Sequence, residues 1–312
     1  MPMARTLDNS VVVLTGATSG LGAATALRLA ARGCRLVLVA RDGRKLEHME
    51  RLCRRRGATA ITAAMDVSDP DAVSRLADRT ETLFGHIDAW VSNAAVTEFA
   101  KLVDVPVEDL QRVLSVDLLG PVYACREVIP RMVRGRGGVV LLVGSVLGET
   151  TVPFKGAYAM AKHGLSAAAA TMRQELRAAG HRNTSISVVM PGYIDTPLFG
   201  HAANRTGRKP RPLTPRASTA RVSRHLVRLL EAPRPRVYLG WEAKAIGWGT
   251  RISPTVSERL LGYWGRRQLG SRDKDAQGAG NLYRSAPTPA RISGGWTNPW
   301  FFRTVRGGRR AG

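Results

Sequence analysis

The chain has 312 residues, 44% of them hydrophobic, which is enough to bury the core of one large domain or two small ones. Its three cysteines, Cys34, Cys53 and Cys125, form no Cys-x-x-Cys pair, so we expect reduced thiols, no disulfide framework and no metal site. The first ten residues are too short and too polar for a signal peptide, and no apolar run reaches the roughly 18 residues of a membrane-spanning helix. These features predict a cytoplasmic protein.

The net charge of +23 is unevenly distributed along the chain. Residues 201–312 carry 23 Lys or Arg against 5 Asp or Glu, whereas residues 1–200 carry 24 against 19. A basic C-terminal region could bind nucleic acid, an anionic membrane surface or an acidic partner. We prefer the alternative of a compositional bias, because arginine, alanine and valine are frequent throughout the chain.

A glycine-rich turn follows the first predicted strand. Residues 10–15 form an apolar run rich in valine, which is typical of a buried strand. Gly16, Gly20 and Gly22 come next, and residues 23–31 then read as a helix. A strand, a glycine-rich turn and a helix in this order let backbone N–H groups and a helix N-terminus hold a pyrophosphate.

The end of the second strand bears on the choice of cofactor. Residues 35–40 end at Ala40, where NAD-binding proteins usually place an acid that holds the ribose 2′-hydroxyl. Arg41 follows instead, and a guanidinium suits a 2′-phosphate. Asp42 is an alternative ribose ligand, or it caps the helix predicted over residues 44–56. We therefore expect NADP(H), with NAD(H) as the alternative.

Strands and helices continue to alternate as far as residue 239. Strands are predicted over residues 60–65, 87–91, 138–143, 184–190 and 236–239, and helices over residues 70–84, from 107 past Asp117, and over 156–179. This alternation predicts an α/β fold, a Rossmann-type doubly wound sheet of about seven parallel strands in a single domain over residues 1–240. Residues 241–312 form a basic, tryptophan-containing C-terminal extension.

The predicted strand ends carry residues suited to ligand binding. Ligands of such sheets bind at the carboxyl edge of the strands, so these residues should lie close together. They are Gly16, Arg41, Asp66, Asn93, Ser145 and Pro191.

A tyrosine and a lysine stand four residues apart at the start of the helix predicted over residues 156–179. Positions i and i+4 of a helix share one face, so Tyr158 and Lys162 should point the same way. A nearby ammonium favours phenolate and should lower the pKa of Tyr158, which would make its hydroxyl a usable general acid or base.

Several short motifs occur along the chain in a definite order. They are Thr15-Gly16-x-x-x-Gly20-Leu21-Gly22, Asp66-Val67, Ser92-Asn93-Ala94-Ala95, Ser145, Tyr158-x-x-x-Lys162 and Pro191-Gly192-x-x-x-Thr196. As a set they resemble the short-chain dehydrogenase/reductase family over roughly residues 8–240. The resemblance implies a nicotinamide-dependent oxidoreductase that interconverts a carbonyl and a hydroxyl on a small molecule.

The resemblance also implies roles for individual residues. Tyr158 would exchange a proton with the substrate oxygen, Lys162 would hold the nicotinamide ribose, and Ser145 would orient the carbonyl. The Ile194 N–H and Thr196 would hold the carboxamide, and Asp66 with Val67 the adenine. The residues expected at the cofactor are Gly16, Thr18, Ser19, Gly20, Leu21, Gly22, Arg41, Asp66, Val67, Asn93, Ala94, Tyr158, Lys162, Pro191, Ile194 and Thr196.

One position departs from the family's pattern in a way that bears on catalysis. Asp117 stands where the family usually has an asparagine that relays protons towards the lysine. Its spacing from Val113 and Leu114 predicts that it faces inward, where a carboxylate is costly unless it is paired or protonated. Asp117 therefore either keeps the relay while stabilising Lys162 as a cation, or marks an enzyme with an impaired relay.

Small and apolar residues lead to expectations about subunits and substrate. Ala157, Ala161, Gly164 and Ala168 form a small-residue face that suits either a subunit interface or packing within the monomer. The family resemblance favours a homodimer or homotetramer. Apolar residues near the motifs suggest a lipophilic substrate.

The C-terminal extension is the hardest part to interpret. Residues 238–264 mix aromatic and basic side chains, which suits a membrane-surface helix or a nucleic-acid surface. We prefer a third interpretation, an extra helix that folds back over the sheet or over a neighbouring subunit and buries the tryptophans. From Gly270 onward the chain is expected to be extended or disordered, although Trp296, Trp300, Phe301 and Phe302 could dock. Two alternatives to an enzyme remain, a nucleotide-binding regulator on the same fold and a surface binder acting through the basic tail.

Overall fold

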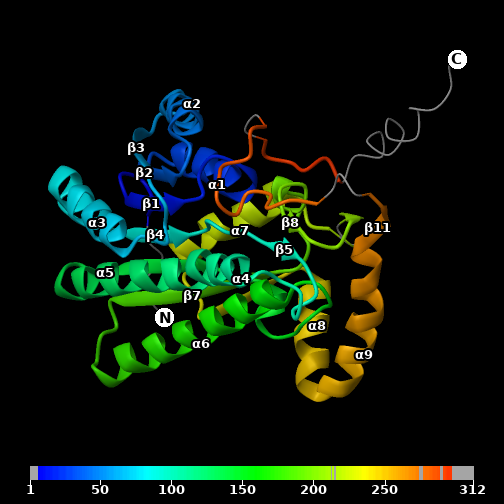
Figure 1. Ribbon diagram of the computed structural model, residues 1–312. Coiled ribbons are helices and arrows are strands. Elements are labelled where there is room, and N and C mark those ends of the chain that lie inside the picture. Colours follow the sequence, from blue (N-terminus) through cyan, green and yellow to red (C-terminus); the bar gives the residue numbers. More distant parts are fainter. Residues whose placement is uncertain (1–5, 212, 214–215, 274–276, 289–290, 297–312) are drawn as a thin grey trace, which may run out of the picture.

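Seven parallel strands form the central sheet, in the order β10-β7-β6-β4-β1-β2-β3 (Figure 1). The computed structural model describes residues 6–211, 213, 216–273, 277–288 and 291–296. The strands are β1 (Val11–Thr15), β2 (Arg35–Ala40), β3 (Thr59–Ala64), β4 (Ala89–Ser92), β6 (Gly138–Val143), β7 (Thr184–Pro191) and β10 (Arg236–Leu239). The order reverses between β1 and β4, and ligands of doubly wound sheets bind at such a reversal. The predicted fold class is confirmed.

Helices cover both faces of the sheet. On one face lie α1 (Gly20–Ala30), α2 (Gly43–Arg54) and α7 (Thr219–Glu231), and on the other lie α3 (Pro70–Phe84), α5 (Gly120–Arg134) and α6 (Gly156–Ala178). Successive residues of β1 alternate between the two cores, since Val12 and Leu14 pack towards α1 while Val13 packs towards α5. Burial on both faces explains the almost continuous apolar runs of these strands.

The helix predicted from residue 107 past Asp117 is interrupted. Helix α4 (Val107–Leu114) passes into a π-helical turn, η1 (Ser115–Leu119), before α5 begins at Gly120. Such turns insert one extra residue into a helix and often occur at functional sites. In this chain the turn contains Asp117, which is completely buried as its spacing predicted.

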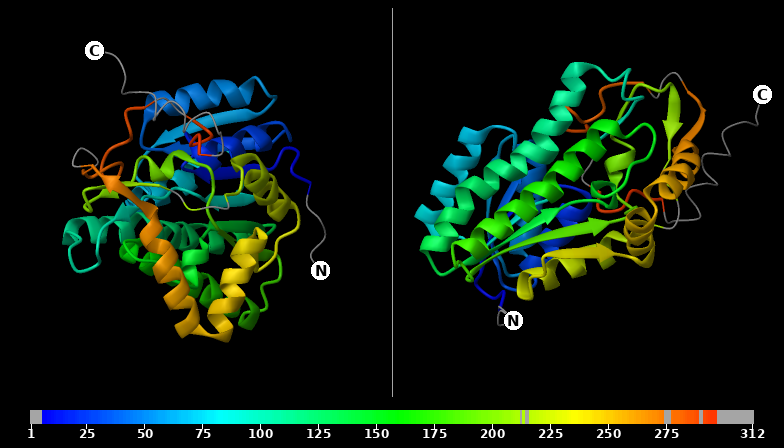
Figure 2. Two further views of the ribbon diagram at one scale, coloured as in Figure 1. Left: turned by 90° about the vertical axis from the view of Figure 1, so that its right-hand side faces the viewer. Right: turned by 90° about the horizontal axis from the view of Figure 1, so that it is seen from below.

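Two further helices follow the sheet. Helices α8 (Trp241–Ile252) and α9 (Pro254–Gly265) form a V that extends away from the sheet (Figure 2). Among the described residues, no helix is long and apolar enough to span a membrane. The expectation that these helices bury their tryptophans against the sheet of their own chain is wrong, because Trp241, Trp248 and Trp264 are 73%, 64% and 48% exposed. Burial against a neighbouring subunit stays a prediction.

Short elements complete the carboxyl edge of the sheet. They are β5 (Glu98–Phe99) paired with β8 (Ala203–Asn204), β9 (Arg208–Pro210) paired with β11 (Leu269–Arg272), η2 (Val146–Gly148), η3 (Pro197–Phe199) and η4 (Arg266–Gln268).

The chain returns to the main domain after β11. Residues 277–288 and 291–296, here called the C-terminal strap, run in irregular extended form beside α1 (Figure 1, red). Leu282 is fully buried in a small core with Val113, Val116 and Ala161. The strap is therefore extended, as one of the two expectations had it, and it is also firmly packed. Trp300, Phe301 and Phe302 lie outside the described residues.

The small-residue face of α6 packs within the chain. Ala157 and Ala161 are buried in the same core as Leu282, and a Cβ on Gly164 would come within 2.9 Å of the Leu118 side chain. Packing within the monomer, one of the two alternatives, thus accounts for Ala157 and Ala161, while Gly164 and Ala168 remain half-buried.

Candidate active site

The glycine-rich turn between β1 and α1 has no room for side chains. Gly16 has a φ of +66°, and a Cβ on Gly22 would lie 2.0 Å from the Gly16 carbonyl oxygen. Asn93, at the end of β4, donates from its amide nitrogen to the carbonyls of Thr15 and Gly16 at 3.0 and 3.2 Å. Asn93 is therefore part of the predicted site, where its hydrogen bonds fix the conformation of the glycine-rich turn.

A cleft at this edge has the lining that a dinucleotide requires. A cavity of about 130 Å³ lies between the strand ends and the C-terminal strap. The predicted cofactor residues that line it are Gly16, Thr18, Ser19, Arg41, Asp66, Val67 and Ala94. The strap contributes Asn281, Ser285, Ala286, Thr288 and Arg291 on the other side. No sequence pattern pointed to these residues as part of the site.

Arg41 contacts the strap. Its guanidinium donates to the carbonyls of Asn281 and Leu282 at 2.6 and 2.8 Å, and Lys45 donates to the carbonyl of Ala286. The Asp42 carboxylate accepts from the Lys45 backbone N–H at 3.2 Å, so it caps α2, as one of its two interpretations had it. The end of β2 is thus cationic on its cleft side.

Backbone donors of the turn are shared with the strap as well. The Gly20 N–H, at the first residue of α1, donates to the Arg291 carbonyl at 2.8 Å. The turn, the helix N-terminus and the cationic groups fit a dinucleotide. Because the strap uses the same donors, a dinucleotide reaching Gly20 must displace the Arg291 carbonyl.

Asp66 is held by basic and hydroxyl groups. Its carboxylate accepts from the Ser68 N–H and hydroxyl at 3.0 and 2.7 Å and pairs with Arg112. Arg112 also donates to the Leu282 carbonyl at 2.8 Å. Burial would raise the pKa of Asp66, but the bonds from Arg112 and Ser68 outweigh it and lower that pKa. Asp66 stays ionised beside Val67 in the cleft.

Tyr158 and Ser145 lie together in the wall of a second, larger cavity. Ser145 is close enough to Tyr158 to act against the rise of its pKa, and the Ser145 oxygen accepts from the Leu147 N–H at 3.1 Å. The predicted lowering of the Tyr158 pKa is wrong in direction. Burial raises the pKa of Tyr158, and Asp117 and Glu98 add to that effect, which outweighs the opposite effect of Lys162.

Lys162 and Asp117 form a buried ion pair. The Lys162 ammonium is 3.0 Å from the Asp117 carboxylate and also donates to the Val143 carbonyl at 3.2 Å. The second Asp117 oxygen accepts from the Val96 N–H at 2.8 Å. Burial alone would lower the pKa of Lys162, but the attraction of Asp117 and Tyr158 raises it, so Lys162 is held as a cation. Asp117 thus has the partner that an inward carboxylate requires.

The residues after β7 close the other side of the cleft. Pro191, Ile194 and Thr196 line the larger cavity, and Thr196 lies against Gly20, where an added Cβ would be only 3.2 Å from the Thr196 Cβ. Asp195 between them binds the strap, accepting from the Ser293 hydroxyl at 2.7 Å and the Trp296 N–H at 2.9 Å. The structure therefore brings together Gly20 and Thr196, two predicted cofactor residues that follow β1 and β7.

The larger cavity measures about 530 Å³ and is mainly apolar. Its walls include Leu147, Tyr193, Leu198 and Phe199, which stand near the motifs in the sequence, and side chains of α8 and α9. Those of the two helices are Trp241, Ala245, Ile246, Leu260, Leu261 and Trp264.

Sequence reasoning also missed a buried charged group in this cavity. Lys155 lies 3.5 Å above the Phe99 ring and donates to the Thr97 hydroxyl at 2.8 Å. Burial lowers the pKa of Lys155 to about 7, although Glu98 and Asp117 oppose the change. Glu98 binds the Ala157 N–H at 3.0 Å at the start of α6. The position of Lys155 three residues before Tyr158 was the available signal, since i and i+3 share a helix face.

The fold and these loops define a dinucleotide-binding α/β protein, and comparison with known sequences identifies its family. The sequence model described as "short chain dehydrogenase" matches residues 10–206. The chain belongs to the short-chain dehydrogenase/reductase family of oxidoreductases.

Individual relatives agree with this assignment. The chain is 33% identical over 261 residues to the uncharacterized oxidoreductase YxnA of Bacillus subtilis. The aligned region covers 82% of this chain and 72% of that protein. It is 34% identical over 207 residues to dehydrogenase/reductase SDR family member 7B of Bos taurus, covering 64% of this chain and 63% of that protein. The chain thus spans less than two thirds of the length of the second relative.

Solved structures show the same fold. An alcohol dehydrogenase from Thermococcus sibiricus, complexed with 5-hydroxy-NADP, matches with a TM-score of 0.65 and 25% identity over 74% of this chain and 95% of its own. A short-chain dehydrogenase/reductase from Burkholderia phymatum in complex with NAD matches with a TM-score of 0.73 and 23% identity over 81% of this chain and 97% of its own.

Proposed function

We propose that the protein is an NADP(H)-dependent oxidoreductase that interconverts a carbonyl and a hydroxyl on a lipophilic small molecule, with Tyr158 as general acid and base. The observation that carries the proposal is the position of the Tyr158 hydroxyl. It borders an apolar cavity of about 530 Å³ together with Ser145 and stands one helical turn from the Lys162–Asp117 ion pair.

Each polar group then has a chemical task. Ser145 orients the substrate oxygen beside Tyr158, and Tyr158 gives that oxygen a proton during reduction. Lys162, held as a cation by Asp117, stabilises the phenolate that remains. The nicotinamide supplies or accepts the hydride when it is bound. The Ile194 N–H and Thr196 would hold its carboxamide.

The raised pKa of Tyr158 favours one direction of proton transfer near neutral pH. A tyrosine that keeps its proton is ready to act as an acid on a carbonyl, whereas alcohol oxidation requires the phenolate. We therefore expect alcohol oxidation to accelerate as the pH rises above neutral and carbonyl reduction to depend much less on pH.

Cationic groups at the end of β2 support the preference for NADP(H). Arg41 and Lys45 line the smaller cavity, and Asp42, the alternative ribose ligand, caps α2. The alcohol dehydrogenase from Thermococcus sibiricus is complexed with a derivative of NADP, which also supports this preference. Arg41→Ala should weaken NADPH binding by about tenfold more than NADH binding. We further propose that the protein forms a homodimer or homotetramer, as the family resemblance implies.

The decisive experiment is a panel of aliphatic and aromatic ketones, aldehydes and alcohols, assayed with NADPH and with NADH. Tyr158→Phe is the matched control, since it removes one hydroxyl and keeps the ring. We expect turnover with NADPH and a loss of about 100- to 10,000-fold in the variant. Full activity of Tyr158→Phe would falsify the assigned role. Nucleotide binding without turnover of any compound would favour the regulator instead.

A further inference from the structure

Helix α8 carries an apolar stripe on its outer side. Trp241, Ala245, Trp248 and Ile252 recur at spacings of four, three and four residues, which places them on one helix face. All four are exposed, and Ile252, the last residue of the helix, is 77% exposed. In a helix of a water-soluble domain such a stripe normally faces the core.

Helix α9 repeats the arrangement. Val256, Leu260 and Tyr263 follow the same four- and three-residue spacing and are all more than half exposed. Small residues, Ala243 and Gly247 in α8 and Gly265 in α9, are the buried ones of the two helices. The hairpin thus turns its small side chains towards the protein and its large apolar ones towards solvent. An apolar surface of this kind marks an interaction site.

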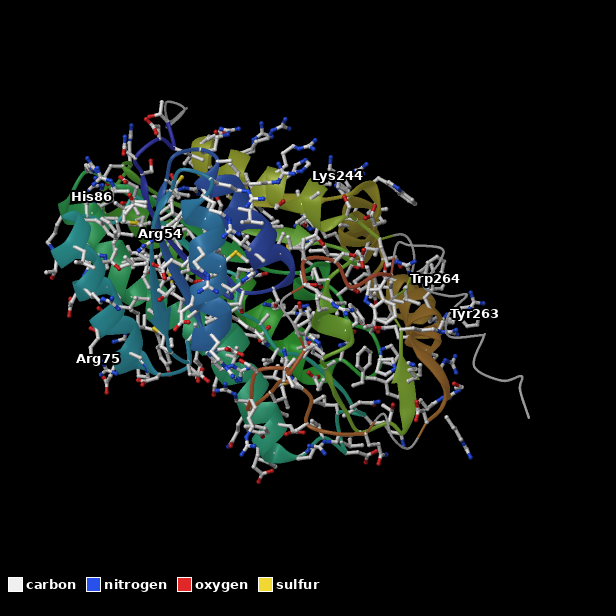
Figure 3. All side chains as sticks on the ribbon, turned by 90° about the horizontal axis from the view of Figure 1, so that it is seen from above. Arg54, Arg75, His86, Lys244, Tyr263 and Trp264 are labelled. Atoms are coloured by element: carbon white, nitrogen blue, oxygen red, sulfur yellow. The ribbon has the colours of Figure 1, made fainter. Side chains whose placement is uncertain are left out.

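The two stripes meet at the opening of the larger cavity. Trp241, Leu260 and Trp264 line that cavity and are also exposed, so the cavity reaches solvent beside them. Figure 3 shows Tyr263 and Trp264 projecting from the outer side of α9. A flat apolar phase lying against the hairpin would therefore be continuous with the interior of the cavity.

Basic residues accompany the stripes. Residues 241–272 contain six Lys or Arg, against the two acids Glu242 and Glu258. Lys244, Arg259 and Arg266 are exposed. Tryptophan and tyrosine next to arginine and lysine are typical of side chains at the boundary between lipid headgroups and acyl chains. A second copy of the chain docked through this hairpin fits less well, because it would place the same basic residues against one another and block the cavity opening.

We propose that the α8–α9 hairpin docks on an anionic lipid bilayer, with its tryptophans at the headgroup boundary. On the proposed function, the substrate then passes from the bilayer into the cavity between Trp241 and Trp264. Docking itself depends only on the exposed stripes and their charge, so it is tested separately from catalysis.

Sedimentation with vesicles tests the docking. The full chain is mixed with vesicles of pure phosphatidylcholine or of equal parts phosphatidylcholine and phosphatidylglycerol. We expect binding to the anionic vesicles that weakens as salt is added, because screening reduces the attraction of the basic residues. Trp248→Ser combined with Ile252→Ser should weaken this binding by about tenfold or more, since both side chains are lost from the apolar contact.

Two controls match these changes in other parts of the molecule. Val103→Ser combined with Val107→Ser removes two exposed apolar side chains away from the hairpin and should leave binding unchanged. Arg259→Glu should weaken binding several-fold. Arg75→Glu should have much less effect, because Arg75 lies at the opposite end of the molecule from Trp264 (Figure 3).

Three outcomes would overturn the docking proposal. They are absence of binding to anionic vesicles at low salt, equal binding to neutral and anionic vesicles, and a self-association in sedimentation velocity that Trp248→Ser with Ile252→Ser abolishes. Substrate entry has its own test, once a substrate is known. The same variant should raise KM for substrate carried in vesicles and leave kcat unchanged, and an unchanged KM would overturn that step alone.

Discussion

The two halves of the carboxyl edge differ in where in the sequence their hydrogen-bond and ion-pair partners lie. In the catalytic half, Lys162 and Asp117 are buried side chains on α6 and η1, and their partner groups belong to the same domain. In the nucleotide half, Gly20 and Arg41 donate to backbone carbonyls of the strap, Gly20 to Arg291 and Arg41 to Leu282, which lies 241 residues further along the chain. The first half is fixed by the core, whereas the second depends on a segment that is not part of the sheet. Substitutions should therefore separate proton chemistry from cofactor exchange.

Lys162→Met should have the largest effect. It removes the cation beside Tyr158 and leaves the Asp117 carboxylate buried without its partner. We expect a loss of about 100- to 10,000-fold in kcat and about 3–5 kcal/mol of unfolding free energy. Urea denaturation and steady-state assays measure the two effects.

The double variant Lys162→Met with Asp117→Leu is the control for stability. It removes both charges and should recover much of the lost unfolding free energy while leaving turnover as low as before. Recovery of turnover together with stability would mean that Lys162 matters for folding and not for proton transfer.

Asp117→Asn should have a smaller effect that depends on pH. Without the carboxylate, burial lowers the pKa of Lys162, so the lysine loses its charge as the pH rises. We expect turnover to fall about 10- to 100-fold near pH 8 and less near pH 6. A pH–rate profile of both proteins measures this. Unchanged or improved turnover at every pH would indicate instead that Asp117 impairs the proton relay.

Leu282→Ser should act on the other half of the edge. It places a hydroxyl in an apolar core and weakens the attachment of the strap by more than 1 kcal/mol. Nucleotide entry and exit both require the strap to move, so we expect both rate constants to rise by about tenfold or more. Stopped-flow fluorescence of NADPH measures these rates. Leu176→Ser, at the far end of α6, controls for general destabilisation, and equal rates in all three proteins would contradict the prediction.

Lys155→Met should change the pH dependence of stability. Burial lowers the pKa of Lys155 to about 7, so between about pH 7 and 10.5 the unfolded chain binds the proton that the folded chain has lost. The stability of the wild type should therefore rise with pH relative to the variant in that window, by at most about 1.4 kcal/mol per pH unit. Urea titrations at several pH values measure the slope. Parallel curves of unfolding free energy against pH for the wild type and the variant would contradict this prediction.

Regular periodicity explains why the main domain could be predicted from the sequence. Strand β10, for example, begins at Arg236 and ends at Leu239 as predicted. A short apolar run between turn residues leaves little choice of where the strand begins and ends. Asp117 was placed inward from its spacing alone, and it is completely buried. Local patterns of this kind require no knowledge of distant partners.

Features that depend on distant contacts could not be predicted in the same way. The pKa of Tyr158 is raised because burial, with the Asp117 and Glu98 carboxylates, outweighs Lys162. The effect of Lys162 follows from the i,i+4 spacing, but the burial and the two carboxylates do not. The contact of Arg41 with Leu282 joins residues 241 positions apart. The aromatic stripes of α8 and α9 were visible in the sequence, but periodicity does not say whether a stripe faces the core or the solvent.

The position of the strap late in the sequence affects how the protein would acquire its cofactor in the cell. Synthesis runs from the N-terminus, and domains fold as they emerge. The seven strands of the sheet all precede residue 240, so they leave the ribosome before Leu282 does. A nucleotide can then enter a cleft that is still open on the nascent chain, and the strap packs over it afterwards. Cofactor loaded in this way would afterwards exchange only as the strap moves, so exchange in the finished protein should be slower than the first binding.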